Sequence, residues 1–494
     1  MKLRLIIILF LTSIGLAWSQ ENTPTDFLDS EFHKERRAAF REKMPKNTVA
    51  VFFANPVRNR SNDVDYVYHQ DPDFYYLTGL REPHAALIIY SEEQKNESGE
   101  NFYEQLYVQR RNPRMEQWTG YRLGPEGARG KLGFKQAFNG ADFLKNDFNF
   151  AEFDEVWHKP IVEDVRKQRY NRADLYSIIQ NFKSRVTTTS ASISSEDSAL
   201  DVELKKGKSI GEKSVNTNTK SIRRVMAELR QIKTPKEMSL LKKAVRISAQ
   251  GQIEVMKAMK PNMSETEIQG IHEYVYKKYG SEYEGYPSIV GAGNNGCVLH
   301  YMENNKMTVN DELVLMDLGA EYHGYTADVT RTIPADGTFS REQKAIYDLV
   351  YLAQEAGINA ARVGRPFNDT DKEARRVIVK GLVELGIAKD EKDARQYFPH
   401  GTSHYIGLDV HDAGLYAAHQ PNMVITVEPG IYIPKGSPCD EKWHGIAVRI
   451  EDDILITENG PVNLSAEAPR TSEAIEAMMK RKSALDDFKL PKLD

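Results

Sequence analysis

Short apolar runs separated by turns and charged stretches make up the first part of the chain. The runs at 48–53, 86–90 and 105–108 are bounded by Pro, Gly or polar residues, a pattern typical of strands. Charged segments of helix-forming composition lie between them. This alternation predicts an α/β domain with a mixed sheet over about residues 21–185.

The composition changes between about 184 and 220, where Ser, Thr, Lys and Asn replace most large apolar residues. Such a segment buries too little apolar surface to fold by itself, so we expect a polar linker or insertion. A charged helix-like pattern follows at 222–259. It is interrupted at Thr234-Pro235, because proline restricts the residue before it and is well suited to start a new helix. Further helix-like patterns lie at 265–279, 341–361, 369–385 and after Arg470.

The stretch from Glu312 to Thr332 predicts two strands joined by a tight turn, because its apolar run reverses near His323 and then resumes. Each strand carries one acid, Asp317 or Asp328. With the turn centred on the bond before His323, the two acids face each other with Cβ atoms about 4.5 to 5.5 Å apart. With the turn centred on the bond after His323, they are diagonal neighbours on the same face. Two such carboxylates repel each other unless a cation lies between them, although one could instead cap the turn while the other faces solvent.

A Gly-rich segment at 399–412 contains three histidines, His400, His404 and His411. Small residues rather than a helical repeat separate them, which indicates a loop and a short strand beside a pocket. A single histidine is commonly a packing residue. Three in one short segment favour a functional cluster.

Two later runs, 424–433 and 445–457, have the apolar pattern of buried strands, and each contains one glutamate, Glu428 or Glu451. A carboxylate inside a buried strand needs a partner. Arg449 lies on the same strand face as Glu451, so a plain ion pair between them is one explanation. A shared metal site is the other.

Two Asp, two Glu and one His together form an oxygen-rich set that is too negative to gather without about two divalent ions. Two ions about 3.5 to 4 Å apart can share a hydroxide and form a hydrolase centre. Mn, Co and Zn all suit these donor types, and the spacing does not choose among them. The four acids are Asp317, Asp328, Glu428 and Glu451, and the histidine is one of the three in the 399–412 segment.

These motifs resemble the pita-bread metallopeptidases of the aminopeptidase P and prolidase group. The segments MDLGAEYHGYTADVTRT, HGTSHYIGLDVHD, TVEPGIY and VRIEDD carry the resemblance over about residues 235–470. DPDFYYLTGLREP and EQWTGYRLG resemble the group's creatinase-like amino-terminal domain. The resemblance implies an α/β (α+β) fold, in which that domain precedes a pita-bread catalytic domain with an antiparallel sheet flanked by helices.

The resemblance also implies roles for the candidate residues. Asp317 would hold one of two ions, Asp328 and Glu451 would bridge both, and His404 and Glu428 would complete the other ion's shell. Manganese is the expected metal, with cobalt or zinc as alternatives. Glu428 would also act as general base or proton shuttle.

Four further residues receive roles from the same resemblance. His300, His400 and His411 would line the substrate site, orient the scissile carbonyl and contact the proline residue. Arg449 would orient Glu451. The implied reaction releases the amino-terminal residue from peptides with proline in the second position, by attack of a hydroxide shared between the ions.

Two other functions stay open. A prolidase would cleave only Xaa-Pro dipeptides, although GTSH before Tyr405 and the WTGYRLG segment favour the aminopeptidase. A metal-free creatinase-like hydrolase or binding protein would lack ligand residues, whereas all are present here. We expect the first domain to cover the site and to mediate self-association into a homo-oligomer.

Composition and the amino-terminal sequence indicate the number of domains, argue against nucleic-acid binding and predict export. With 494 residues, 40% of them hydrophobic, the chain can form two or three domains, and a net charge of −5 offers no basic field for nucleic acid. A basic start, an apolar core and small residues before Gln20 predict a signal peptide cleaved after Ser19, so we expect export to a periplasm or outside the cell without a membrane anchor. An uncleaved amino-terminal anchor is the alternative. Cys297 and Cys439 are expected to be free thiols.

The expected organisation is a signal peptide at 1–19, a creatinase-like domain at 20–220 with the polar insertion at about 184–220, a catalytic domain at 221–480 and a tail at 481–494.

Overall fold

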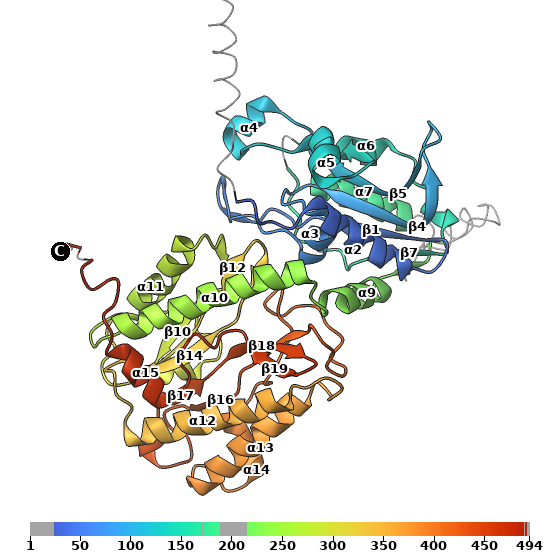
Figure 1. The fold of residues 1–494 in the computed structure, drawn as a ribbon. Coiled ribbons are helices and arrows are strands. Elements are labelled where there is room, and N and C mark those ends of the chain that lie inside the picture. Colours follow the sequence, from blue (N-terminus) through green and yellow to red (C-terminus); the bar gives the residue numbers. More distant parts are fainter. Residues whose placement is uncertain (1–23, 169–170, 188–214, 489, 492–494) are drawn as a thin grey trace, which may run out of the picture.

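The computed structural model describes residues 24–168, 171–187, 215–488 and 490–491 (Figure 1). The expected signal peptide at 1–19 and residues 188–214 of the expected insertion lie outside these ranges. Figure 1 shows the amino-terminal elements as one layered body above a larger body formed by the rest of the chain.

A six-stranded sheet forms the centre of the amino-terminal domain, in the order β6-β5-β4-β1-β7-β8. β4 pairs antiparallel with β1 and β5, whereas the pairs β1-β7, β5-β6 and β7-β8 are parallel, so the predicted mixed sheet is confirmed. The strands are β1 (Thr48–Phe53), β4 (Ala86–Lys95), β5 (Asn101–Val108), β6 (Ala137–Asn139), β7 (Glu155–His158) and β8 (Thr217–Asn218), with a small separate hairpin of β2 (Asn59–Ser61) and β3 (Val64–Asp65).

Helices cover both faces of this sheet because its central strand is apolar on both. Val49 and Val51 of β1 pack with Phe143 and Phe182 on one face, while Phe52 packs with the other core cluster. The helices of this domain are α2 (Ser30–Glu42), α3 (Pro72–Thr78), α4 (Pro113–Thr119), α5 (Gly124–Leu132), α6 (Gly140–Lys145), η1 (Phe150–Glu152) and α7 (Leu175–Thr187), and all of them except α4 bury residues.

The ends of the expected polar insertion are ordered parts of this domain, which corrects the boundary at about 184. α7 continues to Thr187, because Ile178 and Phe182 bury its apolar side. On the far side of residues 188–214, Thr217 of β8 pairs with Val156 of β7.

Two helices, α9 (Lys220–Arg230) and α10 (Pro235–Ala258), lead into the carboxy-terminal domain. The predicted break lies between them. Thr234 caps α10, since its hydroxyl accepts from the Glu237 N–H and the Glu237 carboxylate accepts from the Thr234 N–H, and Pro235 occupies the first turn.

The carboxy-terminal domain consists of small antiparallel sheets between helices. β10-β11-β14, β13-β12-β9, β15-β18-β19 and β16-β17 are the sheets, and every strand pair in them is antiparallel. The strands are β9 (Tyr283–Glu284), β10 (Ile289–Ala292), β11 (Leu313–Asp317), β12 (Ala320–Tyr322), β13 (Tyr325–Thr326), β14 (Thr330–Pro334), β15 (Val424–Val427), β16 (Gly430–Ile433), β17 (Ile446–Arg449), β18 (Asp452–Thr457) and β19 (Gly460–Asn463).

Helices flank these strands on opposite sides (Figure 1). α10 and α11 (Glu265–Lys278) lie on one side, and α12 (Arg341–Ala360), α13 (Asp369–Glu384) and α14 (Glu391–Ala394) lie on the other. The remaining elements are η2 (Gly293–Cys297), η3 (Arg395–Tyr397), η4 (Glu441–Trp443) and α15 (Ser472–Met479). Among the described residues no helix combines the length and the apolar character needed to cross a bilayer.

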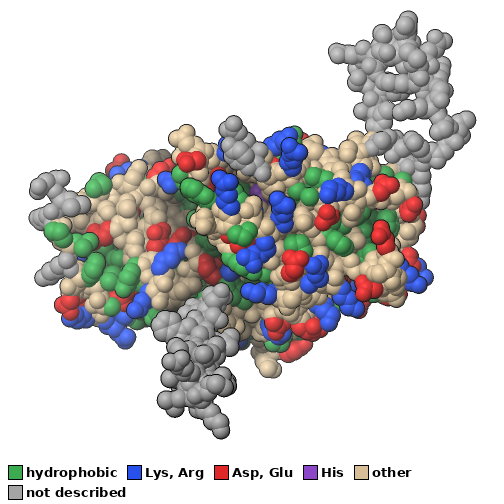
Figure 2. Space-filling model, turned by 90° about the horizontal axis from the view of Figure 1, so that it is seen from above, with side chains coloured by type: hydrophobic (Ala, Val, Ile, Leu, Met, Phe, Trp, Pro, Cys, Tyr) green, Lys and Arg blue, Asp and Glu red, His purple; other side chains and the backbone are tan. Residues whose placement is uncertain are grey.

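Within the described ranges the surface is charged and the cysteines form no disulfide. Figure 2 shows Lys and Arg side chains intermingled with Asp and Glu over one face. Cys297 and Cys439 are free, as predicted.

Candidate active site

The predicted hairpin forms, with the turn centred on the bond after His323. Tyr322 pairs with Tyr325, and His323 and Gly324 between them have φ values of +52° and +88°. Two successive positive φ angles are typical of the turn that best joins twisted antiparallel strands. The register with the turn centred on the bond before His323 is therefore wrong.

Asp317 consequently pairs with Thr330 rather than with Asp328. Asp328 lies in a gap between β13 and β14, and its N–H donates to Asp453 Oδ2 at 3.1 Å. The two acids are still joined, because the Tyr286 hydroxyl lies 2.7 Å from Asp317 Oδ1 and 2.5 Å from Asp328 Oδ1.

Glu428 and Glu451 also lie between strands, not inside them as predicted. Glu428 separates β15 from β16, and Glu451 lies between β17 and β18. β15 pairs with β18 whereas β16 pairs with β17, so the chain changes sheets at each glutamate. Each glutamate therefore lies outside the strand pairing of both sheets.

All of the sequence-predicted site residues line one cavity of about 480 Å³. The structure thus brings together segments that are far apart in the sequence. The predicted residues in the lining are His300, Asp317, Asp328, His400, His404, His411, Glu428, Arg449 and Glu451.

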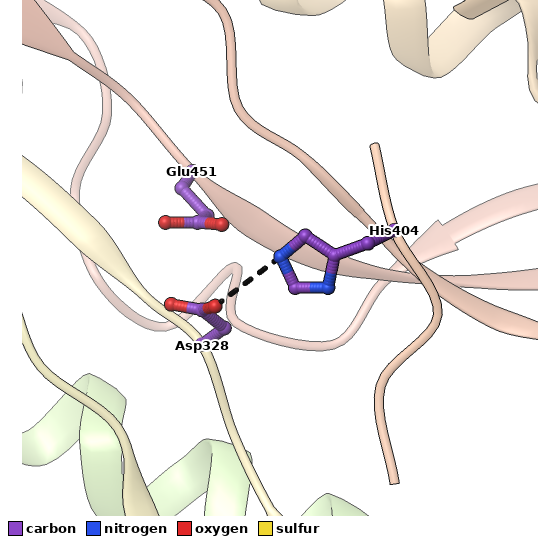
Figure 3. Close-up of side chains that lie close together, drawn as sticks. All are labelled: Asp328, His404 and Glu451. Carbon is purple, nitrogen blue, oxygen red and sulfur yellow. Dashed lines mark ion pairs between the residues drawn. The ribbon is translucent and has the colours of Figure 1, made fainter. Parts of the chain in front are cut away.

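Asp328, His404 and Glu451 converge most closely. One ligand atom from each lies within 4.8 Å of the others, and Figure 3 shows the two carboxylates and the imidazole facing one another. His404 Nε2 is 3.5 Å from Asp328 Oδ2 and 3.4 Å from Glu428 Oε1. Carboxylate oxygens and an imidazole nitrogen at such distances are suited to a divalent cation.

Two details of hydrogen bonding support that fit. His404 Nδ1 lies 3.0 Å from the Tyr405 carbonyl, which accepts its proton and leaves the Nε2 lone pair directed at the acids. Glu451 Oε2 accepts from the Thr330 hydroxyl at 2.6 Å, whereas its buried Oε1 has no hydrogen-bond partner among the described residues. An unpartnered buried carboxylate oxygen is costly unless a cation satisfies it.

The acids carry strongly altered proton affinities. Burial, together with the charges of Asp317 and Glu428, raises the pKa of Asp328 well above its usual value. Burial and the neighbouring aspartates do the same to the pKa of Glu451. Burial and the charge of Glu451 raise the pKa of Glu428 to about 8. Divalent cations would relieve this repulsion and allow the carboxylates to ionise together.

Asp317 shows the opposite shift because it has a permanent cationic partner. Burial alone would raise the pKa of Asp317, but the Arg449 guanidinium and the Tyr286 hydroxyl outweigh burial and lower it. Arg449 Nη2 donates to Asp317 Oδ2. One acid of the site is therefore ionised by the protein itself.

Among the described residues Arg449 and Glu451 do not form the direct ion pair that was one explanation of their shared strand face. Within the described ranges its guanidinium donates to Asp317, to the Tyr432 hydroxyl at 2.8 Å and to the Thr330 hydroxyl at 3.4 Å. Thr330 in turn donates to Glu451. The arginine thus acts on Glu451 through Thr330, which the sequence interpretation missed.

The other histidines line the same cavity. His400 Nδ1 donates to the Gly401 carbonyl at 2.8 Å, so its Nε2 accepts from the Tyr432 hydroxyl at 2.8 Å. Burial and the nearby Arg449 lower the pKa of His400 to about 4, which keeps the ring neutral. His411 packs edge-on against His404 with ring centroids 4.4 Å apart, and His300 lies exposed at the rim.

Comparison with known proteins identifies the family. Residues 33–149 match the aminopeptidase P amino-terminal domain, and residues 239–458 match metallopeptidase family M24. The chain is 36% identical to the Xaa-Pro aminopeptidase of Escherichia coli (strain K12), over 91% of this chain and 97% of that protein. The chain belongs to metallopeptidase family M24.

The M24 chain is similar to further proteins over most of its length. Xaa-Pro aminopeptidase 3 of Rattus norvegicus is 32% identical over 88% of this chain and 81% of that protein. The solved structure of E. coli aminopeptidase P with the inhibitor Pro-Leu matches with a TM-score of 0.77 and 33% identity, covering 92% of this chain and 98% of that chain. Pseudomonas aeruginosa aminopeptidase PepP gives a TM-score of 0.77 at 31% identity. The predicted fold class, an amino-terminal creatinase-like domain before a pita-bread metallopeptidase domain, is confirmed.

Proposed function

We propose that this M24 enzyme is an Xaa-Pro aminopeptidase that releases the amino-terminal residue from peptides with proline in the second position. The observation that carries the proposal is the single cavity in which the acids and histidines converge. The similarity to Xaa-Pro aminopeptidases over nearly the whole chain supports it.

Two divalent ions belong to this proposal, with manganese favoured over cobalt and zinc. When bound, they supply a Lewis acid for the scissile carbonyl and a low-pKa water. The residues proposed to hold them are Asp317, Asp328, His404, Glu428 and Glu451.

Side chains of the protein carry out the proton transfer and position the substrate. A bond to proline has no N–H, so the departing nitrogen must receive a proton from the site. Glu428 lies 3.4 Å from His404 and 3.6 Å from His400, which places its carboxylate to accept a proton from water and return it to that nitrogen. Both nitrogens of His400 are engaged by Gly401 and Tyr432, so His400 fixes the shape of the site, and the exposed His300 is free to contact the peptide.

Hydrolysis of Ala-Pro-Ala, Ala-Pro and Ala-Ala-Ala by the chelator-treated and manganese-loaded enzyme tests the proposal. We expect manganese-dependent release of alanine from Ala-Pro-Ala and little turnover of Ala-Ala-Ala. Cleavage of Ala-Pro alone would instead identify a prolidase. Absence of bound or activating metal would favour a creatinase-like or binding role.

We further propose a homo-oligomer assembled through the first domain. Tyr66, Val67, Trp118 and Tyr121 of this domain are exposed by 58% or more, which is unusual for large apolar side chains. Light scattering of the purified enzyme tests this, and a strict monomer would contradict it.

Export completes the proposed function. The amino-terminal pattern supports cleavage after Ser19 and transfer to a periplasm or the outside of the cell. Mass spectrometry of the enzyme from its native host should find Gln20 at the amino terminus. A chain that retains residues 1–19 in the cytoplasm would contradict export.

A further inference from the structure

Glu265 is a fully buried carboxylate in the first turn of α11, outside the cavity. Its two oxygens receive four hydrogen bonds. Oε1 accepts from the Ala292 N–H at 2.8 Å and from Asn295 Nδ2 at 3.0 Å. Oε2 accepts from the Tyr301 hydroxyl at 2.9 Å and from the Lys306 N–H at 2.8 Å.

These donors lie at both ends and in the middle of one segment, residues 292–306. The segment leaves β10 through η2 and returns before β11. A carboxylate accepts at both oxygens, so one side chain closes the segment into a loop.

Asn304 anchors the same segment from a second direction. Its backbone is left-handed, with φ at +44°, and its side chain is buried. Oδ1 accepts from the Val290 N–H at 2.8 Å, and Nδ2 donates to the Ser288 carbonyl and to Gln269 Oε1, both at 2.8 Å. The amide thus ties the segment to β10 and to α11.

His300 lies between these anchors and lines the active-site cavity. It is exposed, whereas the adjacent Tyr301 is buried and bonded to Glu265. The His300 ring forms no hydrogen bond with any other described residue. Its position over the cavity is therefore set by its own backbone, and the backbone is set by the anchors.

We propose that Glu265 and Asn304 are positioning residues for catalysis, which act by holding His300 in place to contact the peptide. The inference rests on the proposed Xaa-Pro aminopeptidase activity. It assigns a role to side chains that reach neither the substrate nor the proposed metal ligands. Glu265 holds the two ends of the segment together, and Asn304 fixes one of those ends to β10 and to α11.

A double-mutant cycle separates this role from general structural support. Glu265→Gln keeps the shape but presents an NH₂ group to one of the backbone N–H donors. We expect kcat/KM for Ala-Pro-Ala to fall by about 100-fold, the scale of an approximately 1 Å misplacement of a catalytic contact. In a His300→Ala background the same change should add less than about threefold, because the group it positions is already gone. Bound manganese should equal that of the wild type in every variant.

Glu267→Gln is the matched control, since Glu267 is exposed two positions along the same helix and should leave kcat/KM unchanged. Tyr301→Phe removes only one hydroxyl. If Glu265→Gln does not fold, Tyr301→Phe replaces it in the double-mutant cycle with His300→Ala. Asn304→Gly keeps the left-handed backbone and tests the second anchor. Equal losses with and without His300 would overturn the inference, while a wild type that cleaves no Xaa-Pro peptide would overturn the proposed function instead.

Discussion

The acids and the histidines that line the cavity are held in different ways. The acid wall, formed by Asp317, Asp328, Glu428 and Glu451, lies at strand ends and in the gaps between strands. The histidine wall, formed by His300, His400 and His411, lies on loops. The acids are buried among one another, whereas each loop depends on contacts outside the cavity.

His411 shows how far such a contact can reach. Its neighbour Asp412 is buried and binds Arg230 and Lys233, the latter at 2.7 Å. Arg230 also lies 2.6 Å from Asp73 on α3 of the first domain. A buried ionic chain thus joins the first domain to the histidine wall.

A different contact holds the loop that carries His400. Arg375 of α13 donates to the carbonyls of Phe398 and His400, the former at 2.8 Å. The two walls therefore have different functions. The carboxylates of the acid wall are suited to hold cations, whereas the histidine wall keeps its geometry through contacts with residues outside the cavity. Changes in the first should remove metal, and changes in the second should leave it bound.

The largest effect is expected from Asp328→Ala, which removes a proposed ligand shared by both ions. Turnover of Ala-Pro-Ala should fall by several orders of magnitude, and bound manganese, measured by inductively coupled plasma mass spectrometry, should fall with it. Near-normal activity with one ion lost would show that Asp328 does not bridge the metals.

Metal removal should expose the repulsion within the acid wall as a pH dependence of stability. The pKa of Glu428 rises from 4.5 to about 8 on folding, so its protonated form stabilises the metal-free fold. That contribution is fully present below about pH 4.5 and is lost as pH rises through 8. Urea unfolding of the chelated enzyme should therefore show decreasing stability over this range.

Asp328 and Glu451 should also make the metal-free fold less stable as pH rises, because folding raises the pKa values of both carboxyls. Manganese should restore stability at pH 8, since cations favour the ionised carboxylates. A metal-free enzyme with a flat stability profile across this range would contradict the repulsion.

The gathering of the acids was predictable from the sequence, and their local geometry was not. A carboxylate inside an apolar run needs a partner, and this made Glu428 and Glu451 stand out. The apolar pattern continues through both residues, so periodicity could not reveal the strand breaks. The hairpin register depended on backbone angles at His323 that the sequence left open between two choices.

The supporting residues carried weaker signals. Tyr286 is one of 24 tyrosines, and its position in the sequence does not show that it joins two acids. Glu265 occupies the first turn of a helix, where acids are common because they complement the helix dipole. Its backbone partners lie 27 and 41 positions away, beyond any local pattern. Asp453, two residues after Glu451 in the motif RIEDD, is a supporting residue that the run of acids could have indicated.

A smaller effect on activity is expected from Asp412→Asn, which breaks the ionic chain behind the histidine wall. Lys233 is 1% exposed and would lose its carboxylate partner, so the free energy of unfolding should fall by about 3 to 5 kcal/mol. We expect kcat/KM to fall by about tenfold while manganese content is unchanged, on the scale of an outer-shell support. The exposed Asp440→Asn is the control, and loss of metal with Asp412→Asn would break the distinction between the walls.

The smallest effect is expected where the domains meet away from both walls. His69 of the first domain lies 2.9 Å from Glu321 on β12, and its side chain is 44% exposed. The hydrogen bond to Glu321 outweighs burial and raises the pKa of His69. Stability from this pair is therefore fully present below the unfolded pKa of about 6.5 and is lost as pH rises through the higher folded value.

Because solvent screens this pair, His69→Gln should lower the free energy of unfolding by less than about 1 kcal/mol at pH 6 and by no measurable amount at pH 9. The change should leave kcat/KM for Ala-Pro-Ala and bound manganese at wild-type values, since neither wall touches His69. Urea titrations at the two pH values measure the first expectation, and steady-state kinetics measure the second. A loss of kcat/KM as large as that of Asp412→Asn would mean that any contact between the domains sets the histidine wall, and that the buried chain through Arg230 has no special part in it.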